Sequence, residues 1–209
     1  MQTVFYFLKR FVNFIEVDVL LLKSISKFKS VLCFLFLYSI LILHFFLENR
    51  YPQINIMTIY YIAQWIMFVY FFSKLKNNNF FNHLALNRGF FRLSTEILLF
   101  LISILAIFVA MNLFIFFTGF NTAKVFVLSS FSLVVDALLF VHWKFWKYLL
   151  FQLFVLLNVL FSFCIANGTY TVNLVDFFQN IMHFNATTTI FVVLIEMMII
   201  LKLFKNDNN

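Results

Sequence analysis

Four titratable side chains lie inside the most apolar stretches of this 209-residue sequence: His44, Asp136, His142 and Glu196. An ionised group in a lipid-like interior is energetically costly, so such residues usually mark an ion or proton path, or a contact that couples helices. Asp136 and Glu196 are therefore the candidate functional residues, with a role in transport or coupling as the sharper hypothesis. Nearby lysines that could pair with them are Lys144, Lys147 and Lys202.

The two histidines are weaker candidates. Asp136 and His142 are six residues apart, which does not place them on one face of a helix. The chain orientation argued below puts His44 and His142 near opposite membrane faces, which argues against a shared metal or haem. We expect both to form hydrogen bonds within a helical bundle or to reach the interface.

No motif in the sequence predicts catalysis. There is no Gly-x-Ser-x-Gly, no His-Glu-x-x-His and no phosphate-binding loop, and the whole chain has three glycines. Cys33 and Cys164 lie in apolar runs without the spacing of a zinc site or a disulfide framework. We therefore expect a non-catalytic protein with no catalytic residue, no metal site and no cofactor.

The composition identifies the elements that must hold these residues. Hydrophobic residues make up 64% of the chain, charged residues 11%, and the mean hydropathy is +0.99. Soluble domains carry about 25% charged residues, and a bilayer core of about 30 Å admits helices of about 20 apolar residues. Because backbone groups in lipid must pair within their own segment, the sequence predicts an all-α polytopic membrane protein.

The predicted organisation has three parts. Residues 1–30 form an amphipathic helix lying in the interface, residues 31–204 form a six-helix transmembrane domain, and residues 205–209 form a polar tail. A short interfacial helix is expected over 174–184. The expected membrane-spanning segments are 31–47, 54–72, 95–117, 125–143, 146–166 and 187–204.

The basic residues predict the orientation. With these six segments, 13 of the 15 Lys and Arg residues fall on one side, and Arg50 and Lys124 fall on the other. The positive-inside rule then places both termini in the cytoplasm or the mitochondrial matrix. Since the basic residues alternate with apolar segments and form no single patch, we expect membrane lipid and not nucleic acid as the partner.

The connection over 73–94 is the most organised polar feature on the basic side. It is too long for a simple hairpin, and its apolar residues alternate with basic and amide residues. Either it rests on lipid headgroups as an interfacial helix, or it is a coupling helix that docks on a soluble partner. The residues that would dock are Phe80, Phe81, Leu84, Leu86 and Arg88.

Two stretches carry a resemblance to a known family. LLLKSISKFKSVLCFLFLYSILILHFF has a basic entry helix running into a Phe-rich span, and FFSKLKNNNFFNHLALNRGFFRLSTEILL connects the second and third spans. In this layout the chain resembles membrane subunits of type-2 ABC exporters, and within them the haem exporter B (CcmB) family of cytochrome c maturation. The resemblance implies a separate ATPase on the basic face, further membrane subunits, and haem delivery across a bacterial or mitochondrial inner membrane.

A second class of function fits the same pattern. Phe-rich helices with few glycines also suit a structural or accessory subunit of an organellar respiratory complex or ATP synthase. In that case Asp136 and Glu196 would be buried against neighbouring subunits, and no soluble ATPase would bind.

Overall fold

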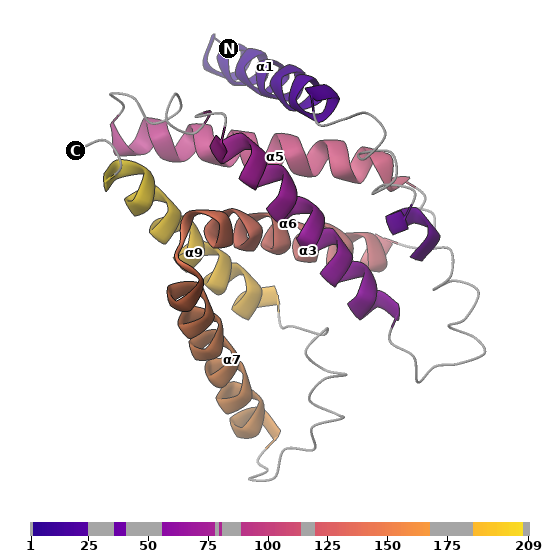
Figure 1. Ribbon diagram of the computed structural model, residues 1–209, viewed down its shortest axis with the longest axis vertical. Helices are drawn as coiled ribbons and strands as arrows, with labels where there is room; N and C mark the ends of the chain where they lie inside the picture. Colours follow the sequence, from indigo (N-terminus) through magenta and orange to yellow (C-terminus); the bar gives the residue numbers. More distant parts are fainter. Residues whose placement is uncertain are drawn as a thin grey trace.

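The computed structural model describes residues 2–24, 36–40, 56–77, 80, 89–113, 120–167 and 186–206, and all regular structure within them is helical (Figure 1). This confirms the all-α prediction for these residues. Besides the short helical stretch at 36–40, the helices are α1 (Gln2–Ser24), α3 (Ile56–Asn77), α5 (Phe90–Met111), α6 (Phe120–His142), α7 (Phe145–Asn167) and α9 (Ala186–Asn206).

Local signals explain where several helices begin and end. The carbonyl of Gly89 accepts the backbone N–H groups of Arg92 and Leu93, both at 3.0 Å, and starts α5 five residues before the predicted position. Helix α3 continues to Asn77. Its last turn contains Lys74 and Lys76, whose positive charges interact favourably with the negative end of the helix dipole. The connection predicted over 73–94 is therefore helical at both of its ends.

Helix α6 lies at the centre of the packing and contacts α3, α5, α7 and α9. Its residues Val134, Leu138 and Leu139 are fully buried. Aromatic rings join it to its neighbours, with the Phe108 and Phe126 rings stacked at 5.8 Å between α5 and α6. Burial of these side chains supplies dispersion contacts that hold the helices together.

Helices α3, α6 and α9 run in the same direction. Residue numbers rise together along the contacts between α3 and α6. Tyr60 contacts Phe126, Trp65 contacts Asp136, and Lys76 reaches the carbonyl of Val141. Along α6 and α9, Glu196 lies beside Asp136 and Phe204 lies against His142. This parallel register brings polar residues of three separate segments to one level of the bundle.

Helices α5 and α7 run the opposite way. Phe72 and then Phe68 of α3 meet Phe100 and then Phe108 of α5, so the order is reversed. Helix α7 follows α6 after a two-residue turn, in which Lys147 donates its backbone N–H to the carbonyl of Lys144 at 2.9 Å. In Figure 1 α7 diverges from the other helices.

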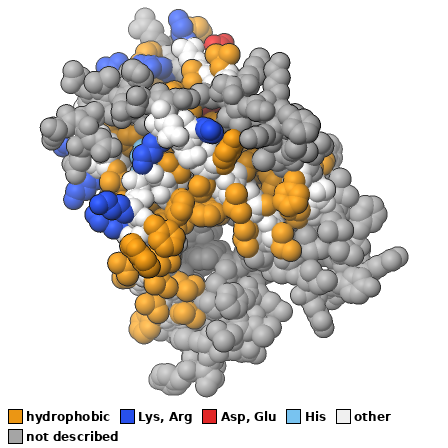
Figure 2. All heavy atoms as spheres, viewed as in Figure 1, with side chains coloured by type: hydrophobic (Ala, Val, Ile, Leu, Met, Phe, Trp, Pro, Cys, Tyr) orange, Lys and Arg blue, Asp and Glu red, His pale blue; other side chains and the backbone are white. Residues whose placement is uncertain are grey.

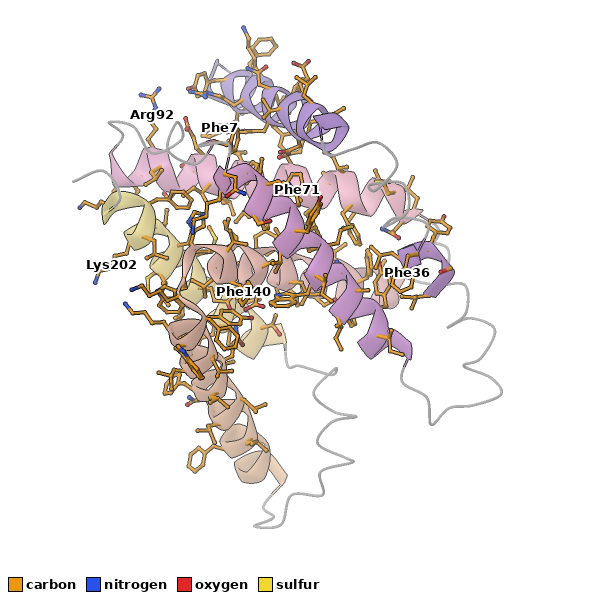
Figure 3. All side chains as sticks on the ribbon, viewed as in Figure 1. Phe7, Phe36, Phe71, Arg92, Phe140 and Lys202 are labelled. Atoms are coloured by element: carbon orange, nitrogen blue, oxygen red, sulfur yellow. The ribbon has the colours of Figure 1, made fainter. Side chains whose placement is uncertain are left out.

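Helix α1 packs along the first half of α5 in the same direction. The contacts recur every turn and pair Tyr6 with Arg92, Arg10 with Glu96, Phe14 with Phe100, and Asp18 with Ser103. The structure places residues 2–24 along α5, and the location of residues 1–30 in the membrane interface stays a prediction. Phe36 lies on the side of the molecule opposite to Arg92 and Lys202 (Figure 3).

Two of the described helices are long and apolar enough to cross a membrane by length and composition. They are α5 over Phe91–Met111 and α6 over Ala123–His142, with mean hydropathies of 2.5 and 2.1, and α7 carries a shorter apolar stretch over Phe145–Asn158. Large apolar side chains also face outward over much of the surface (Figure 2). Of the six predicted membrane-spanning segments, two meet both criteria within the described residues, and the number six stays a prediction.

Candidate functional site: a carboxyl pair between four helices

Asp136 of α6 accepts hydrogen bonds from three side chains on two other helices. Its Oδ2 accepts the indole N–H of Trp65 and the hydroxyl of Tyr148, both at 2.7 Å, and its Oδ1 accepts the amide N–H of Gln152 at 2.5 Å. Hydrogen bonds to a carboxylate are stronger than those between neutral groups. Three directed donors therefore fix the orientation of the Asp136 carboxyl.

The helix arrangement explains why these donors converge. Tyr148 and Gln152 are four residues apart, so both lie on one face of α7. The tight turn between α6 and α7 directs that face back towards Asp136, and the parallel register of α3 and α6 brings Trp65 to the same level.

Glu196 of α9 supplies a second carboxyl beside the first. Its side chain is buried, with 2% of its surface exposed, and it lies close enough to Asp136 and Gln152 for direct electrostatic interaction. Its Oε2 atom is buried and makes no hydrogen bond. Asp136 is more accessible and is only partly buried. Two acids that are buried to different extents therefore share one polar cluster.

Three aromatic rings enclose the cluster. Phe140 lies 5.2 Å from Trp65 and 4.8 Å from Tyr148, both edge to face, and Trp65 stacks on Tyr148 at 6.4 Å. Figure 3 labels Phe140 where α6 approaches α7. Apolar walls lower the local dielectric and strengthen the electrostatic interactions of the carboxyls. We name Trp65, Asp136, Tyr148, Gln152 and Glu196 the carboxyl-pair site.

The structure corrects the expected partners of these acids. Among the described residues neither Asp136 nor Glu196 has an ion pair, and Lys144, Lys147 and Lys202 are exposed. His142 lies beyond the cluster, with its ring 4.8 Å from that of Phe204. The sequence identified both acids and missed Trp65, Tyr148 and Gln152, although the spacing of Tyr148 and Gln152 was a usable signal.

The predicted docking residues are only partly placed. Phe80 is half-buried and its ring lies 5.3 Å from that of Phe100, so it packs against α5. The remaining docking residues, Phe81, Leu84, Leu86 and Arg88, lie outside the described residues, as do Cys33, His44 and the predicted helix over 174–184.

A shallow cavity of about 270 Å³ lies between the last turns of α3 and the turn after α6. Lys76 lines it and donates a hydrogen bond of 2.8 Å to the carbonyl of Val141, close to the end of α6. A cation at a helix C-terminus is stabilised by the dipole, so Lys76 ties α3 to α6.

Further buried polar groups lie towards the other end of α3 and α6. Tyr61 accepts a hydrogen bond of 3.0 Å from Ser129. Tyr60, Gln64 and Ser130 are fully buried, and their side-chain polar atoms make no hydrogen bond to described protein groups. Such groups are normally satisfied by ordered water, so the seam between α3 and α6 is polar well beyond Asp136.

Comparisons of this chain with protein-family models, with curated proteins and with solved structures find no match.

Proposed function

We propose that this protein is a membrane-spanning, non-catalytic subunit of a transport assembly, with a basic face in the cytoplasm or the mitochondrial matrix. The observation that carries the proposal is the alternation of helix direction. Helices α3, α6 and α9 run one way and α5 and α7 the other, as required of consecutive passes through a bilayer (Figure 1). The predicted pass over 31–47 remains a prediction.

The basic residues support this placement because they gather at one end of these helices. Most of the Lys and Arg side chains drawn in Figure 2 lie towards the left and top of the view. Lys124, near the start of α6, belongs to the opposite end. The residues at the basic end are Lys74, Lys76, Arg92, Lys144, Lys147, Lys202 and Lys205. This distribution is the one that the positive-inside rule predicts.

Helix α7 supports a lipid or subunit contact. Its outward side chains Trp146, Leu150, Phe154, Leu157 and Phe161 are each at least 62% exposed. Monomeric soluble proteins rarely expose an apolar stripe of this length, and large exposed apolar patches mark interfaces. A bilayer or a neighbouring subunit would cover it.

The resemblance to haem exporter B proteins gives this subunit its most specific form. In that form a separate ATPase docks on the basic face, other membrane subunits complete the exporter, and haem for cytochrome c maturation is the first substrate to test. The subunit would lie in a bacterial or mitochondrial inner membrane. The second candidate, a structural subunit of a respiratory complex or ATP synthase, is favoured by the exposed stripe of α7.

Single-cysteine accessibility tests the membrane placement. In a Cys33→Ser, Cys164→Ser chain in sealed inner-membrane vesicles, Lys144→Cys and Lys202→Cys should react with an impermeant maleimide from the cytoplasmic or matrix side only. Lys124→Cys, the matched exposed position at the other end, should react from the outer side only. Labelling of all three from one side would overturn the proposal.

Co-purification from mild detergent tests the assembly. We expect an ATPase to co-purify with the tagged chain and to be lost when Phe81, Leu84 and Leu86 are changed to Ser. Phe80 is left unchanged because its ring packs on Phe100 and its loss would disturb the bundle. Recovery of respiratory or ATP synthase subunits, unaffected by these changes, would replace the exporter with the structural-subunit function.

A further inference from the structure

We infer that the carboxyl-pair site is a proton-binding site, in which Glu196 carries one exchangeable proton and directs it towards Asp136. The inference rests on the proposed membrane placement, because that placement keeps bulk water and its ions away from the bundle. It goes further by naming a ligand, the proton, and the group that holds it.

The first support is the lack of a compensating charge. Among the described residues no Lys or Arg forms an ion pair with either acid, and Glu196 has 2% of its surface exposed. Two ionised carboxylates side by side in a low-dielectric interior repel each other and lose hydration. Retaining a proton on one of them removes the repulsion and the desolvation cost of that carboxyl.

The second support is the direction of the hydrogen bonds. Trp65, Tyr148 and Gln152 all donate to Asp136, which is the pattern that favours an ionised acceptor. Of these donors Gln152 also interacts with Glu196, but the buried Oε2 of Glu196 is left without a hydrogen bond. The proton is therefore placed on Glu196, while Asp136 is the carboxylate that the donors stabilise.

The same directions exclude a metal cation as the favoured ligand. A bound Na⁺ or K⁺ needs several oxygen atoms pointing at it, whereas here three N–H and O–H groups point towards Asp136 and occupy its oxygens. Among the described residues no group of three His, Cys, Asp or Glu side chains lies together to form a metal site.

Proton release would act on the bundle through three helices. Asp136 belongs to α6, Glu196 to α9, and Tyr148 and Gln152 to α7. Without the proton, like charges on α6 and α9 face each other, and the repulsion favours their separation. The site thereby couples protonation to the position of α9 and α7.

Infrared spectroscopy of the full chain in bilayers tests the assignment, since a protonated carboxyl has a C=O stretch separate from that of a carboxylate. All samples carry Asp18→Asn, because burial raises the pKa of Asp18 to about 7 and its own band would interfere. At pH 8 we expect a protonated-carboxyl band that shifts in D₂O, shifts with ¹³C-labelled glutamate and disappears in Glu196→Gln. Glu16→Gln, at an exposed glutamate of α1, should leave it unchanged.

Three results would overturn the inference. These are the absence of the band in the parent chain, a shift with ¹³C-labelled aspartate in place of glutamate, and loss of the band when Na⁺ or K⁺ is added. Isotope labelling needs no substitution in the site, so the test holds even if Glu196→Gln fails to fold. A failure here with correct cysteine accessibility would leave the proposed membrane placement intact.

Discussion

At the scale of single residues, the oxygens of Asp136 illustrate how a polar group is accommodated in an apolar bundle. Its carboxyl accepts hydrogen bonds from an indole, a phenol and an amide, and each of these donors would otherwise need its own partner. Such a network is stabilising only when every member is satisfied. Loss of one donor therefore affects both the donor's helix and the acid.

Changing Trp65 to Phe tests this network. The substitution keeps an aromatic ring but removes the N–H that binds Asp136, and we expect a loss of about 1–3 kcal/mol in the free energy of unfolding. The measurement is unfolding of the detergent-solubilised protein by increasing SDS. The control is Trp146→Phe, because Trp146 is 71% exposed. Equal losses in the two variants would contradict a role for the indole N–H.

The residues of the site were only partly predictable. Asp136 and Glu196 stand out because a charge in an apolar run is rare, and that signal is local in the sequence. Their partners depend on which helices are neighbours, and Trp65 comes 71 residues before Asp136. The lysines nearest to these acids in sequence lie outside the cluster, because a lysine at a helix end can extend its charge to water.

At the scale of elements, helices α1 and α5 contact each other along a regular stripe that contains two buried acids. Arg10 forms an ion pair of 3.2 Å with the buried Glu96, whereas the buried Asp18 hydrogen bonds to Ser103 and has no basic partner among the described residues. Burial therefore raises the pKa of Asp18 from 3.8 to about 7, and the hydrogen bond with Ser103 lowers it by less. The charged groups of α5 in this stripe, Arg92 and Glu96, lie one or more turns away.

The docking of α1 should therefore depend on pH. The docked carboxyl keeps its proton up to about pH 7 and the undocked one loses it near 3.8, so docking is strongest below pH 3.8. It weakens by roughly 1.4 kcal/mol per pH unit between these values and is constant above them. Asp18→Asn should abolish this dependence and strengthen docking at pH 8.

Spin labels on Val12→Cys and Leu98→Cys, in a chain without Cys33 and Cys164, report the separation of α1 and α5. Both positions are exposed and lie at one level of the stripe. We expect a broader distance distribution at pH 8 than at pH 5, and a narrow one at both values in Asp18→Asn. Glu16→Gln is the control, and the same broadening in Asp18→Asn would exclude Asp18 as the cause.

Several helices were predictable from the sequence, because their apolar runs have the length and pattern of helices. The segment expected over 146–166 is the helix Phe145–Asn167, and that over 187–204 is Ala186–Asn206. Errors lie at ends fixed by backbone contacts. The start of α5 depends on hydrogen bonds to Gly89.

At the scale of the whole molecule, α6 joins the other helices of the bundle, so stability should be unevenly distributed. Leu138 of α6 has no exposed surface, whereas Leu157 of α7 is 63% exposed. Truncation of a fully buried leucine leaves a cavity, so Leu138→Ala should lower the free energy of unfolding by about 2–5 kcal/mol. Leu157→Ala should change it little. SDS titration compares them, and similar losses would show that α7 is covered by protein.

The parallel arrangement of α3, α6 and α9 also has a consequence for biosynthesis. A ribosome releases Trp65 and Asp136 well before Glu196, which comes 60 residues after Asp136. At about 5–20 residues per second, α6 waits several seconds for its last neighbour. During that interval Asp136 has Trp65, and soon Tyr148 and Gln152, as partners, so its carboxyl has hydrogen-bond donors before Glu196 is synthesised. Glu196 arrives last, and its entry completes the bundle.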